Sequence, residues 1–217
     1  MNINPNARRV LCFGDSNTWG YVPGTKSERY PVNIRWTGVL QKLLGDNFEV
    51  IEEGLNSRGI VKGDSRPGKE QRSAMEYILA CLDSHDPLDF VVVCLGANEL
   101  KAEFNLSAEE VGKNLEKLIQ TITTRPSQFR SIVPQVIIIV PAIINELTDY
   151  AKKDGKFVGA MQKSIELKEV LSLVARENNC VLVDVQDQLS TGVDGVHLLV
   201  ESHQILSEAV SAVIVSH

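Results

Sequence analysis

The sequence RVLCF at residues 9–13, followed directly by Gly14-Asp15-Ser16-Asn17, is the stretch that decides the fold. After Arg9 the run is apolar throughout and lacks the polar alternation of a strand with one face in water. Such runs are typical of parallel strands that helices cover on both faces. A polar turn directly after such a strand lies at the carboxyl edge of the sheet, where ligands bind in open α/β folds.

Further strand-like runs and helical patterns alternate along the rest of the chain. The other predicted strands are 48–52 (FEVIE), 90–95 (FVVVCL), 135–140 (QVIIIV) and 180–185 (CVLVDV). Predicted helices include the stripe Val39–Leu44 before Gly45, the segment after the capping box Ser107–Glu110, and residues 159–178 and 200–215. This order predicts a single α/β domain over residues 1–217, a three-layer α/β/α sandwich with a five-stranded parallel sheet of the flavodoxin-like kind.

Composition and charge limit the classes of partner. Hydrophobic residues make up 43% of the chain and charged residues 23%, as in ordinary globular proteins. The net charge of -6 argues against nucleic acid, which requires a basic face. The same charge disfavours anionic macromolecular substrates, although a local basic pocket remains compatible with it.

The cellular location, and the expectation that no metal or cofactor is bound, are predicted from signals that the sequence does not contain. The N-terminal residues are polar without the apolar segment of a secretory signal, and no apolar run has the length of a membrane span. Four scattered cysteines without a CxxC pair favour a reduced, cytoplasmic setting. No residue group has metal-ligand spacing, and no phosphate-binding loop follows the first strand. We therefore expect neither a metal nor a cofactor.

Residues that can carry chemistry follow several of the predicted strands. Ser16 comes after the first strand, the turn 53–59 (EGLNSRG) after the second, Asn98 after the third, and Asp194 and His197 after the fifth. Because the carboxyl ends of parallel strands share one edge, we expect these residues to lie close together.

Ser16, His197 and Asp194 are the types needed for nucleophilic catalysis. A serine hydroxyl requires a base, and the imidazole base requires a carboxylate that fixes its tautomer. Taken separately, each signal has a simpler explanation. Ser16 could cap a helix, Asn98 could form a local turn, and an Asp-x-x-His pair could occur by chance in a chain of this composition. Because all of these residues are expected at the same edge of the sheet, a catalytic triad of Ser16, His197 and Asp194 is favoured over these separate interpretations.

The same residues resemble the sequence blocks of the SGNH (GDSL-like) hydrolase family. The blocks are Gly14-Asp15-Ser16, the turn 53–59, Gly96-x-Asn98 and Asp194-x-x-His197. Longer strings such as FGDSNTWGYVPG (13–24) and PLDFVVVCLGANE (87–99) are similar to the arylesterase/acyltransferase branch. The resemblance implies Ser16 as nucleophile, His197 as base and Asp194 as its orienter. It also implies an oxyanion hole formed by the Ser16 and Ser57 backbone N–H groups and the Asn98 amide.

Two positions depart from the family pattern, and three residues are assigned more loosely. Ser57 stands where the family has glycine, and Glu99 replaces an aspartate. Asn17, Trp19 and Arg58 are candidate substrate contacts. Core packing is the alternative for Trp19, and a solvated position in the loop is the alternative for Arg58. His85, His203 and His217 are expected at the surface.

The resulting expectation is a serine esterase that cleaves short-chain aryl or alkyl esters, with acyl transfer to alcohols if its pocket is narrow and apolar. The same triad would serve an O-acetyl-sugar esterase, a thioesterase or a lysophospholipase. A non-catalytic flavodoxin-like binding domain is the alternative from another class. Apolar residues in the connection 141–150 (Ile143, Ile144, Leu147) suit either a homo-oligomer interface or burial under a lid.

Overall fold

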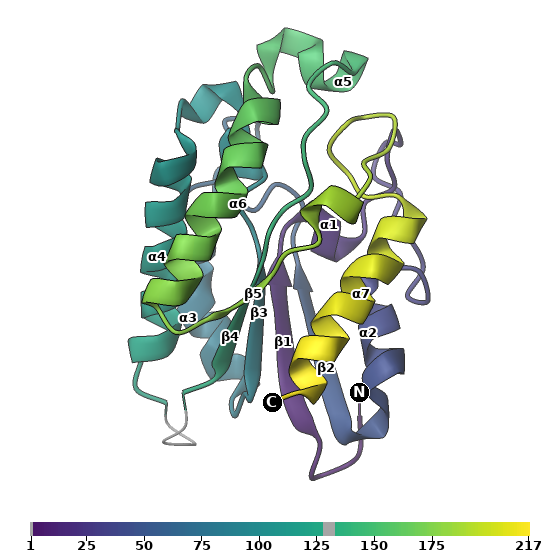
Figure 1. Ribbon diagram of the computed structural model, residues 1–217, viewed down its shortest axis with the longest axis vertical. Coiled ribbons are helices and arrows are strands. Elements are labelled where there is room, and N and C mark those ends of the chain that lie inside the picture. The colour runs from purple at the N-terminus through teal and green to yellow at the C-terminus, as the bar shows by residue number, and fades with distance from the viewer. Residues whose placement is uncertain (1, 128–132) are drawn as a thin grey trace.

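A parallel sheet of five strands forms the centre of the protein (Figure 1). The computed structural model describes residues 2–127 and 133–217. The strand order is β2-β1-β3-β4-β5, and every neighbouring pair is parallel. The strands are β1 (Arg8–Gly14), β2 (Phe48–Gly54), β3 (Phe90–Cys94), β4 (Gln135–Ile139) and β5 (Val181–Val183). The predicted five-stranded α/β/α architecture is therefore confirmed.

Helices cover both faces of this sheet. One layer holds α2 (Trp36–Leu44) and α7 (Val200–Val215), which pack against each other. The other holds α3 (Ala74–His85), α4 (Ala108–Thr124) and α6 (Ala160–Glu177). Two short helices, α1 (Ser16–Trp19) and α5 (Asp149–Lys152), lie above the carboxyl edge of the sheet (Figure 1). No helix among the described residues has both the length and the apolarity to cross a bilayer.

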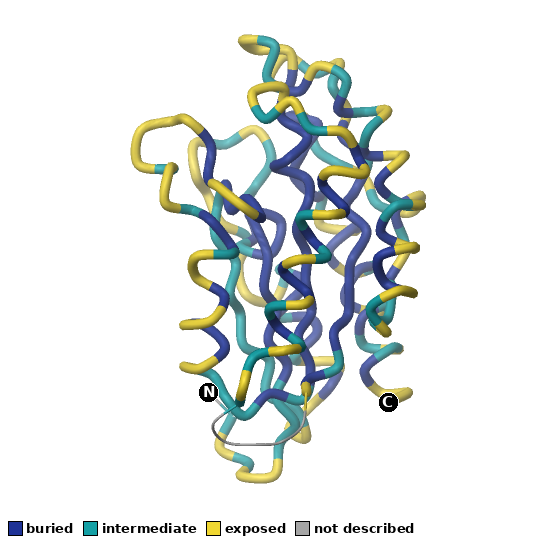
Figure 2. Tube along the Cα trace, turned by 90° about the vertical axis from the view of Figure 1, so that its left-hand side faces the viewer, coloured by how far each residue is buried: buried dark blue, intermediate teal, exposed yellow. Residues whose placement is uncertain are grey.

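Alternate residues of the central strands supply two separate cores. In β1, Leu11 and Phe13 face the layer of α3, α4 and α6, whereas Val10 and Cys12 face α2 and α7. All four are fully buried. Figure 2 shows the same pattern along the trace, with buried strands inside and exposed outer faces on the helices. Burial on both sides explains why these strands read as continuous apolar runs.

The predicted helix signals agree closely with the structure. Ser107 and Glu110 form a reciprocal capping box at the start of α4. The predicted segment 159–178 corresponds to α6, and the predicted terminal helix has the bounds of α7. Helix α3, which the sequence analysis did not identify, begins at a serine cap: the Ser73 hydroxyl accepts a hydrogen bond from the Glu76 N–H. The predicted last strand was too long, since β5 covers only Val181–Val183.

Candidate active site

Ser16 is held at the end of β1 by a tight turn. Asp15 caps α1, and its Oδ1 accepts a hydrogen bond of 2.9 Å from the Asn17 N–H. A Cβ atom at Gly14 would lie 2.0 Å from the Thr18 hydroxyl oxygen, so the first turn of α1 packs here only against glycine. The turn therefore fixes Ser16 at the carboxyl edge of the sheet.

Ser16, His197 and Asp194 form an unbroken hydrogen-bonded chain. The distance from Ser16 Oγ to His197 Nε2 is 3.0 Å, and that from His197 Nδ1 to Asp194 Oδ2 is 2.8 Å. The other Asp194 oxygen accepts the N–H groups of Val196 and His197, each at 3.0 Å. Burial by itself would raise the pKa of the Asp194 carboxyl, but the hydrogen bonds and charge of His197 lower it to about 2. The carboxylate therefore stays ionised beside the imidazole.

The loop that carries Asp194 and His197 depends on a glycine and an aromatic ring. Gly195 has φ 75°, and a Cβ atom there would lie 2.2 Å from the Asn145 carbonyl oxygen. The ring of Tyr21 stacks on the His197 imidazole with centroids 4.2 Å apart. Both contacts restrict the orientation of the imidazole towards Ser16.

Asn17 connects α1 to this loop. Its Oδ1 accepts the Leu198 N–H at 3.0 Å, and its Nδ2 donates to the Val196 carbonyl at 3.4 Å. The two bonded residues flank His197. Asn17 was predicted to contact substrate; it does line the cavity, but its side-chain amide is used within the protein.

The three predicted oxyanion residues line one cavity. Asn98 is the first residue of the 3₁₀ helix Asn98–Leu100, and its Nδ2 lies 3.3 Å from Asp15 Oδ2 and 3.2 Å from the Arg58 carbonyl oxygen. Ser57 has φ 64°, the left-handed region in which its family counterpart, glycine, is free of strain. Its backbone N–H is retained, and its hydroxyl accepts a hydrogen bond of 2.6 Å from Arg66.

The cavity beside Ser16 is small and mostly polar. Its volume is about 190 Å³. Its apolar wall consists of Ala97, Val196, Phe157 and the rings of Tyr21 and Tyr150. Four cationic side chains also line it: Arg66, Lys69, Lys101 and Lys156. None of the four was predicted as a site residue, because each lies outside the family blocks in a polar connection, where lysine and arginine are usually solvated.

Three sequence-based assignments need correction. Arg58 is neither solvated nor a cavity residue: its guanidinium donates to the Gly14 carbonyl and lies over the Phe13 ring, 4.1 Å from the centroid. Trp19 lies outside the cavity, half-buried against Arg29. His203 is fully buried between α7 and α2, where its Nδ1 accepts the Trp36 N–H and burial lowers the pKa of its imidazole to about 4.

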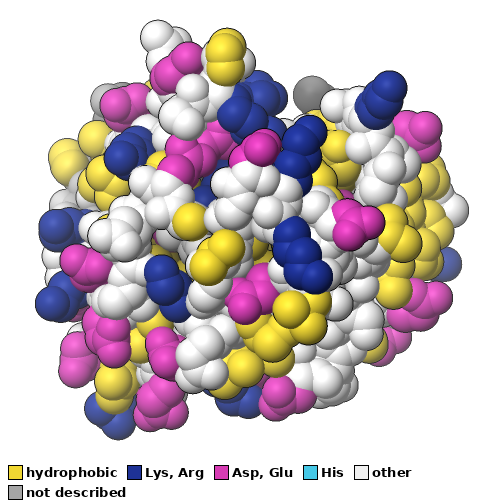
Figure 3. Space-filling view, turned by 90° about the horizontal axis from the view of Figure 1, so that it is seen from above, with side chains coloured by type: hydrophobic (Ala, Val, Ile, Leu, Met, Phe, Trp, Pro, Cys, Tyr) yellow, Lys and Arg dark blue, Asp and Glu magenta, His cyan; other side chains and the backbone are white. Residues whose placement is uncertain are grey.

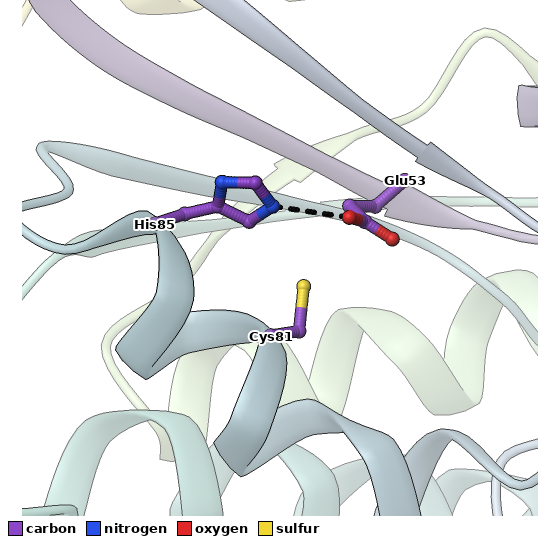
Figure 4. A group of neighbouring side chains, drawn as sticks. All are labelled: Glu53, Cys81 and His85. Carbon is purple, nitrogen blue, oxygen red and sulfur yellow. Dashed lines mark hydrogen bonds and ion pairs between the residues drawn. The ribbon is translucent and has the colours of Figure 1, made fainter.

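A second group of chemically active side chains lies between β2 and α3 (Figure 4). Potential ligand atoms of Glu53, Cys81 and His85 all fall within 4.8 Å of one another. His85 Nε2 bonds Glu53 at 3.0 Å, and the Arg58 guanidinium lies 3.9 Å from the same carboxylate. Burial raises the pKa of the Cys81 thiol to about 12. Since a metal would compete with Arg58 and require the thiolate, the expectation of no metal stays our prediction.

Comparison with known proteins identifies the family. The sequence model of the GDSL-like Lipase/Acylhydrolase family matches residues 12–205, and the chain belongs to that family. The comparison with curated proteins produced no match.

Several solved structures resemble the chain closely. Est24, a carbohydrate acetylesterase from Sinorhizobium meliloti, has a TM-score of 0.88 and 32% sequence identity; the match covers 96% of this chain and 99% of Est24. The aryl esterase of M. smegmatis has a TM-score of 0.87 and 33% identity, over 97% of this chain and 99% of that one. A lipolytic protein of the G-D-S-L family from Veillonella parvula shares the fold at 19% identity and a TM-score of 0.69, over 97% of this chain and 100% of the other.

These relationships and the family assignment identify the chain as a carboxylic ester hydrolase.

Proposed function

We propose that the protein hydrolyses short-chain carboxylic esters through an acyl-Ser16 intermediate. The observation that carries the proposal is the hydrogen-bonded chain from Ser16 Oγ through the His197 ring to Asp194. Such a chain activates a hydroxyl that is otherwise a weak nucleophile.

In the first half-reaction, Ser16 Oγ attacks the carbonyl carbon of the ester while His197 Nε2 takes the hydroxyl proton. Asp194 holds the Nδ1–H tautomer and stabilises the imidazolium. The backbone N–H groups of Ser16 and Ser57 and the Asn98 amide are the proposed donors to the tetrahedral oxyanion. Collapse of the intermediate breaks the bond to the alcohol, which leaves with the proton from His197.

In the second half-reaction, water takes the place of the alcohol. His197 accepts a proton from the water as its oxygen attacks the acyl carbon. The second tetrahedral intermediate collapses, the carboxylic acid leaves, and Ser16 Oγ recovers its proton from His197. The net reaction consumes one ester and one water and yields an acid and an alcohol.

The cavity argues for small acyl groups. At about 190 Å³ it is below the roughly 300–1,000 Å³ of sites that hold drug-sized ligands. A lysophospholipase would need an apolar channel for a long chain, and this cavity is lined mainly by polar side chains. Acetylated carbohydrates and aryl esters, the substrate types in the names of the similar enzymes, are thus the first substrates to test. Because polar side chains line most of the cavity, it does not exclude water. We therefore expect hydrolysis of the acyl-enzyme to be faster than acyl transfer to an alcohol.

The same proposal covers partners and location. The partner is a small-molecule ester. The cysteines of the described residues are unpaired, and three of them are buried, which is consistent with the cytoplasmic location expected from sequence.

Within the connection 141–150, Ile144 is buried by its own chain, whereas Leu147 is 63% exposed. A homo-oligomer interface would therefore involve Leu147 and not Ile144, and light scattering on the wild type would test it.

The test of the mechanism is the hydrolysis of 4-nitrophenyl acetate by variants of the triad. Ser16→Ala and His197→Ala should each lower kcat by about 10⁴ or more. Ser216→Ala and His217→Ala, at the exposed C-terminus, serve as matched controls and should keep the wild-type rate. A fluorophosphonate probe should label the wild type once per chain and leave Ser16→Ala unlabelled. Wild-type rates in either triad variant would refute the mechanism, and failure to label would favour the non-catalytic binding domain.

A further inference from the structure

The proposed mechanism of ester hydrolysis uses none of the cationic side chains that line the catalytic cavity. Arg66 and Lys69 come from the connection after β2, and Lys156 comes from the connection after α5. Two chain segments that are far apart in sequence thus bring positive charge to the same cavity. The chain as a whole has a net charge of -6, so the positive charge gathered at this cavity is opposite in sign to the net charge of the protein. Figure 3, which looks down on this edge of the sheet, shows Lys and Arg side chains near the middle of the face, with Asp and Glu side chains among them.

A buried carboxylate fixes part of this cluster in place. Asp64 is almost fully buried, and it accepts hydrogen bonds of 2.8 Å from Lys101 Nζ and 2.9 Å from Arg66 Nε. Burial opposes ionisation of Asp64, but these two hydrogen bonds hold the pKa of its carboxyl below the usual range. Arg66 also donates to the Ser57 hydroxyl, beside the proposed oxyanion donor. The Arg66 guanidinium is therefore held next to the reacting centre.

The other two cations differ from Arg66 and Lys101 in their partners. Among residues 2–127 and 133–217, neither Lys69 nor Lys156 forms an ion pair with a carboxylate. Lys156 Nζ donates to the Tyr150 hydroxyl at 2.6 Å. Burial and the nearby Arg66 lower the pKa of the Lys156 ammonium to about 8. Burial, Arg72 and Arg66 also lower the pKa of Lys69. Burial disfavours the charge of both lysines most, and repulsion from the arginines adds to it, so an anion placed between these groups would stabilise their charged forms.

We propose that Arg66, Lys69 and Lys156 form a subsite that binds a carboxylate carried by the ester substrate. The inference rests on the proposed esterase function and adds the substrate class to it: esters with a free acid group near the scissile bond. Asp64 and Ser57 use the Nε and Nη2 donors of Arg66, so Arg66 contributes its positive charge and its Nη1 donors to the subsite. The two lysines add further charge. Arg66, Tyr150 and Lys156 also line an adjoining hollow of about 470 Å³, which leaves room for the rest of the substrate.

The experiment compares acidic esters with neutral partners of nearly the same shape. One arm places the acid on the acyl side: 4-nitrophenyl hemisuccinate against its methyl ester, followed by release of 4-nitrophenol. The other arm places it on the alcohol side: 4-acetoxybenzoate against methyl 4-acetoxybenzoate. The readout is the ratio of kcat/KM for the acidic ester to that for its neutral partner. It is measured for the wild type, Lys69→Gln and Lys156→Gln, with Lys152→Gln as the control, an exposed lysine of α5 that does not line the cavity.

We expect the wild type to prefer the acidic ester by about tenfold or more in one arm, which assigns the carboxylate to the acyl or the alcohol side. Lys69→Gln and Lys156→Gln should each reduce that ratio several-fold, and Lys152→Gln should not change it. Added salt should weaken the preference, because ions screen these partly exposed charges. Equal rates for acidic and neutral esters in both arms, or a preference that survives both substitutions, would overturn the subsite. Failure of the wild type to hydrolyse any of the four esters would instead refute the esterase proposal itself.

Discussion

At the scale of single residues, Glu99 is the least satisfied charged group near the site. It is almost fully buried, its Oε1 accepts the Ile60 N–H, and its Oε2 has no hydrogen-bond partner among the described residues. Burial raises the pKa of the Glu99 carboxyl to about 7, although the bond from Ile60 opposes the change. The longer side chain that replaces the family's aspartate thus supports the loop at Ile60 without a second partner of its own.

This pKa predicts a pH-dependent effect of Glu99→Gln on stability. Because the folded-state pKa lies above the ordinary value of 4.5 for a glutamate side chain, the folded protein binds the extra proton between about pH 4.5 and pH 7. The stability due to this group is present below pH 4.5 and is lost as the pH rises through 7. Glutamine imitates the neutral acid, so the variant should match the wild type at pH 5 and exceed its melting temperature by several °C at pH 8.

Thermal unfolding at the two pH values checks the prediction. Glu103→Gln, in the exposed 3₁₀ helix Ala102–Phe104, is the control and should follow the wild type at both. Parallel loss of stability with pH in the wild type and in Glu99→Gln would show that the buried carboxyl is not the cause.

The sequence could predict those site residues that belong to a short motif following a strand. Ser16, Asp194 and His197 follow strands within short motifs, so their shared edge could be inferred from strand order alone. Arg58 was misjudged because a loop arginine is usually solvated, whereas here the Phe13 ring and the Gly14 carbonyl receive it. Contacts of that kind arise only when β1 and the turn after β2 pack together.

At the scale of elements, the triad depends on the contact between α1 and the loop that precedes α7. Besides the Ser16–His197 bond, this contact holds two hydrogen bonds from the Asn17 side chain, one on each side of His197. Asn17 acts on the reaction only through the imidazole and is therefore a positioning residue. Its two bonds join parts of the chain that the fold alone brings together.

Removing that side chain should misplace the base and leave the cavity intact. Asn17→Ala should lower kcat by about 10- to 100-fold with a much smaller change in KM. Asn17→Asp keeps the acceptor for the Leu198 N–H and loses the donor to Val196, so its kcat should lie between those of the alanine variant and the wild type. Steady-state kinetics with 4-nitrophenyl acetate, beside a melting curve for each variant, measure the effect. An unchanged kcat in Asn17→Ala, or a defect confined to KM, would contradict the positioning role.

Element prediction succeeded where burial or capping imposes a pattern. The apolar runs predicted the strands, and the capping box predicted the start of α4. Helix α3 was missed although the Ser73 cap marks its start, because a lone Ser-x-x-Glu signal precedes a helix with exposed apolar residues such as Tyr77 and Leu79. β5 was predicted too long because the β-rich pattern includes Cys180 before it and Val185 after Asp184, whereas only Val181–Val183 pair with β4.

At the scale of the whole molecule, an acidic protein encloses a basic cavity. The sequence established the overall charge, but only the folded chain brings Arg66 and Lys156 together from connections that follow β2 and α5. The charge of such a cavity depends on how the loops fold, and loop conformation is difficult to predict from the pattern of residues in the sequence. The fold was therefore predictable from the strands, whereas the substrate class requires the cavity.

The pH dependence of substrate preference follows from this arrangement. The groups around Lys156 are the Tyr150 hydroxyl, the cations Arg66 and Lys101, and the carboxylates of Asp64, Glu103 and Asp194. With a pKa of about 8, the Lys156 ammonium is charged below that pH and neutral above it. The preference for an acidic ester over its neutral partner should thus be present at pH 7 and decline as the pH rises through 8 to 9. Taking the ratio of the two esters removes the pH dependence of the triad, which both share.

Lys156→Gln separates this titration from that of other groups. The variant should show a lower ratio at pH 7 and a nearly flat profile up to pH 9, because it lacks the group that loses its proton. Lys152→Gln should reproduce the wild-type decline. A wild-type ratio that stays constant across this range would mean that Lys156 does not meet the substrate's charge. A decline of equal size in Lys156→Gln would assign the titration to another cation of the cavity, with Lys69 the first to substitute.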